Sequence, residues 1–101
     1  MTEKPAIILD PHFRTIDEIF SRADFERLKA LANVIWASDQ PMPHDAFREA
    51  LPQAEAVICA DWRYGDEALR EANRLRAVLT VSGGFPRQID YDACFARGIR
   101  V

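Results

Sequence analysis

Several features that would place this chain in a specialised class of protein are missing from its 101 residues. No apolar run approaches the roughly 20 residues that a membrane-spanning helix needs. The first residues, Met-Thr-Glu-Lys-Pro, lack the basic and apolar stretches of a signal peptide. The 13 basic residues are scattered and the formal net charge is −3, so we expect neither nucleic acid nor an anionic membrane as a partner. The expected compartment is the cytoplasm.

Cysteine and histidine are too few and too far apart for a disulfide framework or a metal site. The chain has two of each, Cys59, Cys94, His12 and His44, and no CxxC or HxxxH pair. Cys59 lies in an apolar run and Cys94 in an expected helix, so both are predicted to be reduced thiols that pack as small hydrophobes. Hydrophobic residues at 49% and charged residues at 29% are typical of one globular domain.

The sequence does contain a regular alternation of short apolar runs and helical segments. The apolar runs predict strands buried on both faces, at residues 6–9, 34–37, 56–60, 77–81 and 99–101. Helices are expected between them, with caps at Thr15 (a capping box with Glu18), Asp66 and Asp90, and with Gly98 ending the last one. The alternation predicts an α/β fold, namely a flavodoxin-like open parallel sheet of about five strands in the order 2-1-3-4-5, with helices on both faces.

Two apolar stripes mark the expected core-facing sides of the first helices. Their helical spacing predicts that they are buried. The first stripe is Ile16, Ile19 and Phe20, and the second is Phe25, Leu28 and Leu31.

In an open parallel sheet, ligands bind beyond the carboxyl ends of the strands, where loops 10–14, 61–65 and 82–88 are expected. The last of these contains Ser82-Gly83-Gly84, which includes two of the chain's four glycines. Adjacent glycines let main chain approach a ligand closely, and their N–H groups can donate to an anion such as a carboxylate or phosphate. An ordinary strand-to-helix turn is the alternative.

The other polar and aromatic residues of these loops have simpler interpretations beside the functional ones. His12 and Arg14 can belong to a polar loop without chemistry, and Arg87 to the rim of a site. Arg63 can be a solvated surface arginine. The aromatic rings in Asp61-Trp62-Arg63-Tyr64 can pack over the end of the sheet or against another domain.

A longer pattern around the glycines is more specific than the glycines themselves. LRAVLTVSGGF (75–85), IDYDAC (89–94) and RGIRV (97–101), preceded by AEAVI (54–58), resemble the first lobe of the NAD-dependent D-2-hydroxyacid dehydrogenases. That resemblance implies a flavodoxin-like substrate-binding domain whose glycine loop holds the substrate carboxylate through backbone N–H groups. By position, Ser82, Gly83 and Gly84 inherit this role, and Arg63 has a weaker claim as a basic residue of the loop after the third strand.

The resemblance implies an oxidoreductase that transfers hydride between NAD or NADP and a small 2-hydroxy or 2-keto acid, and a full-length homodimer. The family's dinucleotide-binding domain and catalytic residues follow the fifth strand, so residues 1–101 are expected to be a fragment that binds no cofactor and is inactive alone. The loop also departs from the family pattern. Five steps separate Gly84 from Ile89, where four are usual, which shifts the anion-binding N–H groups by up to one residue.

Two other functions remain open on the sequence. A response-regulator receiver shares this fold, and Asp10 and Asp61 lie near its acidic positions. However, its acidic pair after the first strand and its later lysine are absent. A non-enzymatic interaction module is the second alternative, and an exposed apolar sheet end would favour it.

Overall fold

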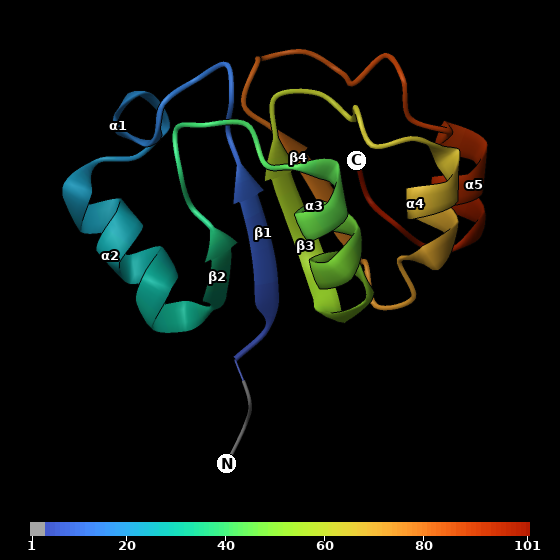
Figure 1. Ribbon diagram of the computed structural model, residues 1–101, viewed down its shortest axis with the longest axis horizontal. Helices are drawn as coiled ribbons and strands as arrows, with labels where there is room; N and C mark the ends of the chain where they lie inside the picture. The colour runs from blue at the N-terminus through green and yellow to red at the C-terminus, as the bar shows by residue number, and fades with distance from the viewer. Residues whose placement is uncertain (1–3) are drawn as a thin grey trace.

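A parallel β-sheet forms the centre of the protein in a computed structural model that describes residues 4–101. The strands are β1 (Ala6–Asp10), β2 (Asn33–Trp36), β3 (Ala54–Cys59) and β4 (Ala77–Thr80). They form one sheet in the order β2-β1-β3-β4, and every pair is parallel. All carboxyl ends therefore meet at one edge, the upper edge in Figure 1. The predicted flavodoxin-like fold class is confirmed, with four strands in place of about five.

The predicted fifth strand is reduced to a single bridge beside β4. Arg100 pairs with Ala77, accepting from Val78 N–H at 2.7 Å and donating to the Arg76 carbonyl at 2.9 Å. Alternate residues of a strand bond to its neighbour, so the next ladder residue toward the preceding helix would be Gly98. Its N–H instead donates to the Phe95 carbonyl at 3.2 Å, and its backbone is left-handed, with φ of 72°. The segment therefore has the predicted place and direction but too few free backbone groups to extend the sheet.

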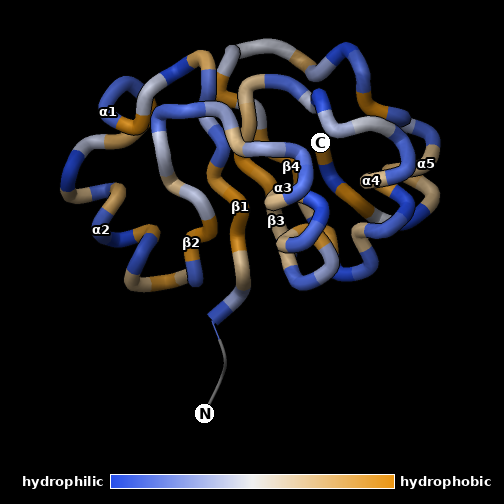
Figure 2. The backbone as a smooth tube through the Cα atoms, in the orientation of Figure 1, coloured by the Kyte–Doolittle hydropathy of each residue, from blue (hydrophilic) through white to orange (hydrophobic). Residues whose placement is uncertain are grey.

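The main core lies between one face of the sheet and the helices α3 (His44–Ala50), α4 (Asp66–Glu71) and α5 (Tyr91–Ala96). Strand side chains alternate between faces, and those that point into this core come from three strands. They are Ile8, Val57, Cys59 and Val78, which pack with Phe47, Leu51, Leu69 and Cys94. The short 3₁₀ turn η1 (Leu51–Gln53) leads from α3 into β3. The hydropathy colouring in Figure 2 runs strongly apolar along β1 and β3, as expected for central strands.

The two helices at the β2 side of the sheet are much less covered. Neither α1 (Ile16–Ile19) nor α2 (Arg22–Leu31) contains a buried residue, and Leu31 is 70% exposed. The prediction that their apolar stripes are core was therefore wrong. α2 packs against β2, which is an edge strand with no buried residue of its own, so the stripes meet too little surface to become buried. Phe20 and Phe25 instead stack on each other, with ring centroids 5.9 Å apart.

Local signals at the helix ends mostly match the sequence. Glu18 Oε1 accepts from Thr15 N–H at 3.0 Å, and the Asp90 carboxylate accepts from Ala93 N–H at 3.0 Å. Gly98 has the left-handed backbone expected after α5, with φ of 72°. Asp66 is not the cap of α4, because Gly65 holds that position with φ of 91°. None of the helices within residues 4–101 is long and apolar enough to cross a membrane.

Candidate functional site

A cavity of about 650 Å³ opens at the carboxyl edge of the sheet. Three segments that are distant in sequence form its wall: the loop after β1, the end of β3, and the glycine loop after β4. Its lining residues are Phe13, Ala60, Asp61, Ser82, Gly84, Phe85 and Arg87. The structure thus brings Ser82 and Gly84 to a concave surface at the place where open parallel sheets bind ligands.

The glycine loop is fixed at its two ends and open in its middle. Val81 N–H donates to the Cys59 carbonyl at 3.0 Å, and Thr80 Oγ1 donates to the Gly84 carbonyl at 2.7 Å. At the far end, Arg87 N–H donates to Asp61 Oδ1 at 3.2 Å. The N–H groups of Ser82, Gly83 and Gly84 have no acceptor among residues 4–101. They are therefore donors that face water or a ligand.

Only one of the two glycines in this loop is required by the backbone conformation. Gly83 has φ of 82°, a left-handed conformation that disfavours any side chain. Gly84 lies outside that region, and a Cβ built on it meets no atom within 4 Å. The fold therefore requires a glycine at 83 and does not require one at 84. A side chain at 84 would instead fill part of the open space beside Gly84.

Arg63 lies away from this cavity wall. Its guanidinium pairs with the carboxylate of Asp10, the one charged residue among the described ones that is buried. The same carboxylate accepts from the Tyr64 hydroxyl at 2.5 Å and from Met42 N–H at 3.0 Å. Asp10 thus joins the ends of β1 and β3 to the loop before α3. This Asp10 clamp was missed from the sequence, although a carboxylate directly after a buried strand was a signal for it.

Two aromatic rings pack against Tyr64, the residue whose hydroxyl donates to Asp10. Phe47 and Tyr64 stack with centroids 3.5 Å apart, and Trp62 meets Tyr64 edge-on at 5.1 Å. Trp62 is completely buried and its indole N–H donates to the Gly65 carbonyl at 3.0 Å. The aromatics of this loop therefore pack over the sheet end, as one of the two interpretations of the sequence held.

Burial also governs the two ionisable groups nearest the clamp. It raises the pKa of the Cys59 thiol from 9.0 to about 12, with the negative charges of Asp10 and Asp61 adding to the effect. Burial, and then the hydrogen bond to Asp10, likewise raises the pKa of the Tyr64 hydroxyl. Both groups stay neutral at physiological pH, so Cys59 is not an activated nucleophile.

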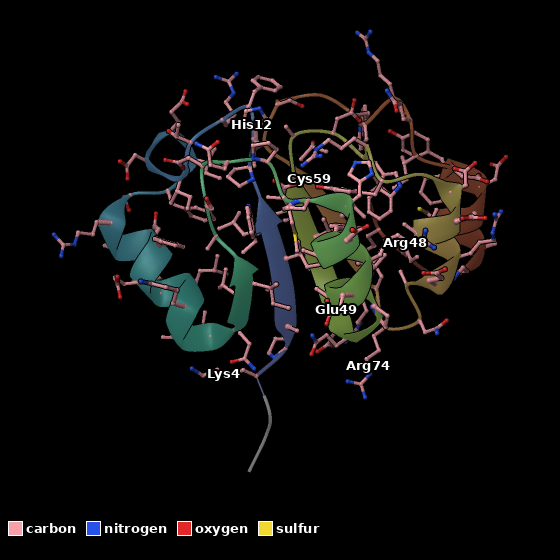
Figure 3. The ribbon with its side chains drawn as sticks, viewed as in Figure 1. Lys4, His12, Arg48, Glu49, Cys59 and Arg74 are labelled. Atoms are coloured by element: carbon pink, nitrogen blue, oxygen red, sulfur yellow. The ribbon has the colours of Figure 1, made fainter. Side chains whose placement is uncertain are left out.

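Two other polar residues of this edge, His12 and Arg14, have partners close by. His12 Nδ1 lies 3.3 Å from the Asp39 carbonyl oxygen, and Arg14 pairs with Glu18 at 3.6 Å. Figure 3 shows His12 above the end of β1 and Cys59 at the end of β3. Within the part of the chain that the structure describes, no group of three or more histidine, cysteine or acidic residues could hold a metal ion.

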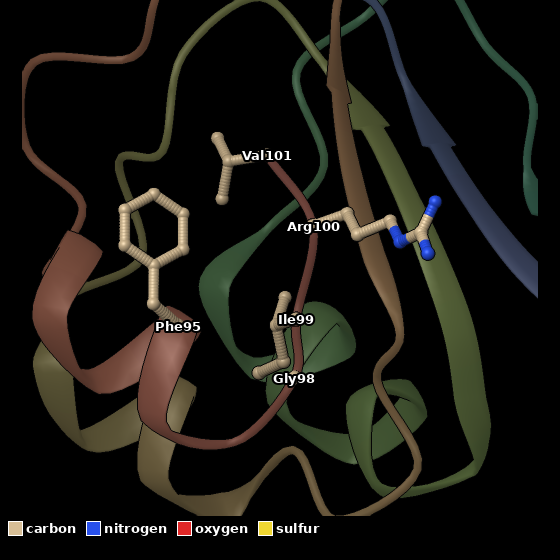
Figure 4. Close-up of a pocket in the computed structure, with 5 residues that line it drawn as sticks. All are labelled: Phe95, Gly98, Ile99, Arg100 and Val101. Atoms are coloured by element: carbon tan, nitrogen blue, oxygen red, sulfur yellow. The ribbon is translucent and has the colours of Figure 1, made fainter.

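A second cavity, of about 540 Å³, lies beside the segment that follows α5. Phe95, Gly98, Ile99, Arg100 and Val101 line it. In Figure 4, Phe95 and Val101 lie on one side of the segment, and the Arg100 side chain extends away from them. This second cavity contains none of the candidate binding residues from the sequence and no pair of groups suited to acid–base chemistry.

Comparison with known proteins decides between the possible uses of this fold. The model of the D-isomer specific 2-hydroxyacid dehydrogenase family, catalytic domain, matches residues 14–101. The chain belongs to this family. A search of curated proteins gave no match.

The dehydrogenase domain is also similar to a solved structure, a phosphoglycerate oxidoreductase from Rhizobium etli. The two share 25% sequence identity with a TM-score of 0.80, over 97% of the present chain. The chain spans only 30% of that protein's length.

The family is NAD(P)-dependent, but the described residues of this domain do not fit a dinucleotide. A dinucleotide site needs a GxGxxG turn that leads directly into a helix N-terminus. Here Gly83 and Gly84 are adjacent, and the next helix starts only at Tyr91, with Asp90 as its cap. The acidic cap Asp90 occupies the position that a pyrophosphate would need, and its negative charge would repel that group.

Proposed function

We propose that this chain is the substrate-binding lobe of an oxidoreductase that transfers hydride between NAD or NADP and a 2-hydroxy or 2-keto acid. In this proposal the backbone N–H groups of Ser82, Gly83 and Gly84 bind the substrate carboxylate. The cofactor is held by a separate domain of the same longer chain, and the full-length protein is a cytoplasmic homodimer. Residues 1–101 alone are then inactive and bind no cofactor.

The free donors of the glycine loop are the observation that carries the proposal. Three successive N–H groups without acceptors line or adjoin a cavity at the ligand-binding edge of the sheet. Such a run of donors matches the two oxygens of a carboxylate, and hydrogen bonds to a charged acceptor are about twice as strong as neutral ones. Because the loop is tied at Thr80 and Arg87, the donors are preorganised before the anion arrives.

Arg63 is the weaker member of the proposed site. Its guanidinium is already paired with Asp10, and its side chain is 32% exposed. A substrate carboxylate would have to share or replace that pairing. We therefore propose contact between Arg63 and substrate only as a secondary, longer-range attraction.

The lobe's part in the reaction is orientation of the acid. Holding the carboxylate in the glycine loop fixes the position of the neighbouring C2 atom, where the oxidation state changes. With C2 held in place, the acid and the hydride donor or acceptor react as positioned groups and not as freely diffusing molecules, which raises the rate strongly. Closure of two lobes over the acid would also exclude water from the site.

A carboxylate titration followed by amide NMR tests the proposal on this chain. Oxalate or glyoxylate is expected to produce selective, saturable shifts at Ser82, Gly83 and Gly84. Chloride and phosphate serve as anion controls, and Gly98, another left-handed glycine on a different part of the surface, as the control amide. Absence of shifts at the loop up to high millimolar ligand, both here and in the full-length protein, would contradict carboxylate binding by these residues.

A further inference from the structure

We infer that the acid bound at the glycine loop carries a large, uncharged apolar side chain, which Phe13 and Phe85 recognise. This rests on the function proposed above and names the class of substrate. The two phenylalanines belong to different loops, after β1 and after β4, and both line the 650 Å³ cavity.

Both rings are unusually open to solvent. Phe13 is 63% exposed and Phe85 is 81% exposed, whereas Phe47 is completely buried. The Arg14 guanidinium lies over the Phe13 ring, 5.5 Å from its centroid. Two exposed aromatic rings beside a few free N–H donors have the composition of a small-molecule site, in which apolar walls surround a small number of polar groups. A ligand that covers them gains the burial of their surface.

The size of the cavity favours a substantial side chain. Small-molecule sites range from about 300 to 1,000 Å³, and this one lies in the middle of that range. Glyoxylate or pyruvate would occupy the glycine loop and leave both rings in water. A benzyl or isobutyl group on the acid would extend from the loop along the rings.

The charges on the wall argue against a second anionic group on the acid. One acidic residue, Asp61, and one basic residue, Arg87, line the cavity, so the wall has no surplus of positive charge. Asp61 Oδ1 already accepts from Trp62 N–H at 2.8 Å and from Arg87 N–H, which holds the carboxylate in place. A side-chain phosphate or carboxylate would approach this fixed negative charge.

Steady-state kinetics of the full-length protein test the inference, with phenylpyruvate and pyruvate as the paired substrates. We expect kcat/KM to favour phenylpyruvate by about tenfold or more, the range that hydrophobic pockets achieve. Phe85→Ala should remove most of that preference by lowering kcat/KM for phenylpyruvate, while the value for pyruvate stays within about twofold. Phe95→Ala is the matched control, because Phe95 is similarly exposed at 64% but lies on α5 outside this cavity.

The possible failures are distinguishable. The inference is wrong, while the proposed function stands, in either of two cases. In the first, the wild type reduces pyruvate with the same kcat/KM as phenylpyruvate. In the second, Phe85→Ala lowers kcat/KM equally for both substrates. Equal loss would indicate that Phe85 supports the loop or contacts another domain. If no 2-keto acid is reduced and oxalate shifts no loop amide, the proposed function itself fails and the inference fails with it.

Discussion

Substituting the two loop glycines one at a time separates folding from binding. Gly83→Ala places a methyl group on a backbone with φ of 82°, which costs about 1–2 kcal/mol. The reduced freedom of the unfolded chain offsets about 0.4–1 kcal/mol of that. We therefore expect Gly83→Ala to lower the free energy of unfolding by about 0–1.6 kcal/mol, with weaker binding following from a distorted loop.

Gly84→Ala should behave in the opposite way. Its backbone is not left-handed and the added Cβ meets nothing within 4 Å, so only the unfolded-state term of about 0.4–1 kcal/mol remains, and the protein becomes slightly more stable. The methyl group projects into space that the ligand needs, however, because Gly84 lines the cavity. Affinity for oxalate should fall about tenfold, equivalent to about 1.4 kcal/mol.

Urea unfolding and the amide titration measure the two effects separately. Gly98→Ala is the matched control for strain, since Gly98 is also left-handed and open but lies outside the cavity. It should lose stability as Gly83→Ala does and keep wild-type affinity. If Gly84→Ala bound oxalate as tightly as the wild type, the absence of a side chain at 84 would have no role in binding and the reasoning would be refuted.

Three further changes test the surroundings of the site. Asp10→Ala should lower the free energy of unfolding by about 3–5 kcal/mol, because it leaves the Tyr64 and Met42 donors and the Arg63 cation without their partner. Urea unfolding measures this loss, with Asp92→Ala as the exposed control. A loss below about 1 kcal/mol would contradict the clamp. The pKa of the Cys59 thiol is about 9 in the unfolded chain and about 12 in the folded protein. The contribution of the neutral thiol to the free energy of unfolding is therefore complete below pH 9. It is lost as the pH rises to 12, by up to about 1.4 kcal/mol per pH unit. Cys59→Ala should therefore flatten the measured decline in stability between pH 9 and 10, and an unchanged slope would count against the raised pKa. Thr80→Val should lower stability by about 0.5–1.5 kcal/mol, because it removes the hydrogen bond to the Gly84 carbonyl. It should also speed amide exchange at Val81 and Arg87, the hydrogen-bonded N–H groups at the two ends of the glycine loop; unchanged exchange rates there would mean that the Thr80 bond does not restrain the loop.

The positions of the strands could be predicted from local patterns, and their order and direction from general rules of sheet topology. Short β-rich runs separated by helical segments leave few topologies, and the right-handed crossover rule leaves fewer. The helix ends at Thr15 and Asp90 were equally accessible, since a capping side chain bonds within its own few residues. The helix ends depend on interactions close in sequence, whereas the strand order, in which β1 pairs with the distant β3, follows from the crossover rule.

The errors arose where the outcome depends on distant packing. The spacing of Phe25, Leu28 and Leu31 correctly indicated a helix with an apolar face, but burial also needs a surface to cover that face, which an edge strand provides only in part. The reduction of the fifth strand is an exception, because it follows from a local helix end in which Gly98 N–H donates to the Phe95 carbonyl. Arg63 illustrates the same limit at the site, because its partner Asp10 is 53 residues away in the sequence.

The Asp10 clamp divides the carboxyl edge into two parts with different tolerance to change. One part, the loops joined through Asp10 and the stacked rings of Phe47 and Tyr64, is densely bonded, so substitutions there are expected to threaten folding. The other part, around Gly84 and Phe85, is exposed and meets open space. A library randomised at 84 and 85 would therefore retain a large fraction of folded members, and such a division lets substrate preference evolve, or be engineered, without first acquiring extra stability.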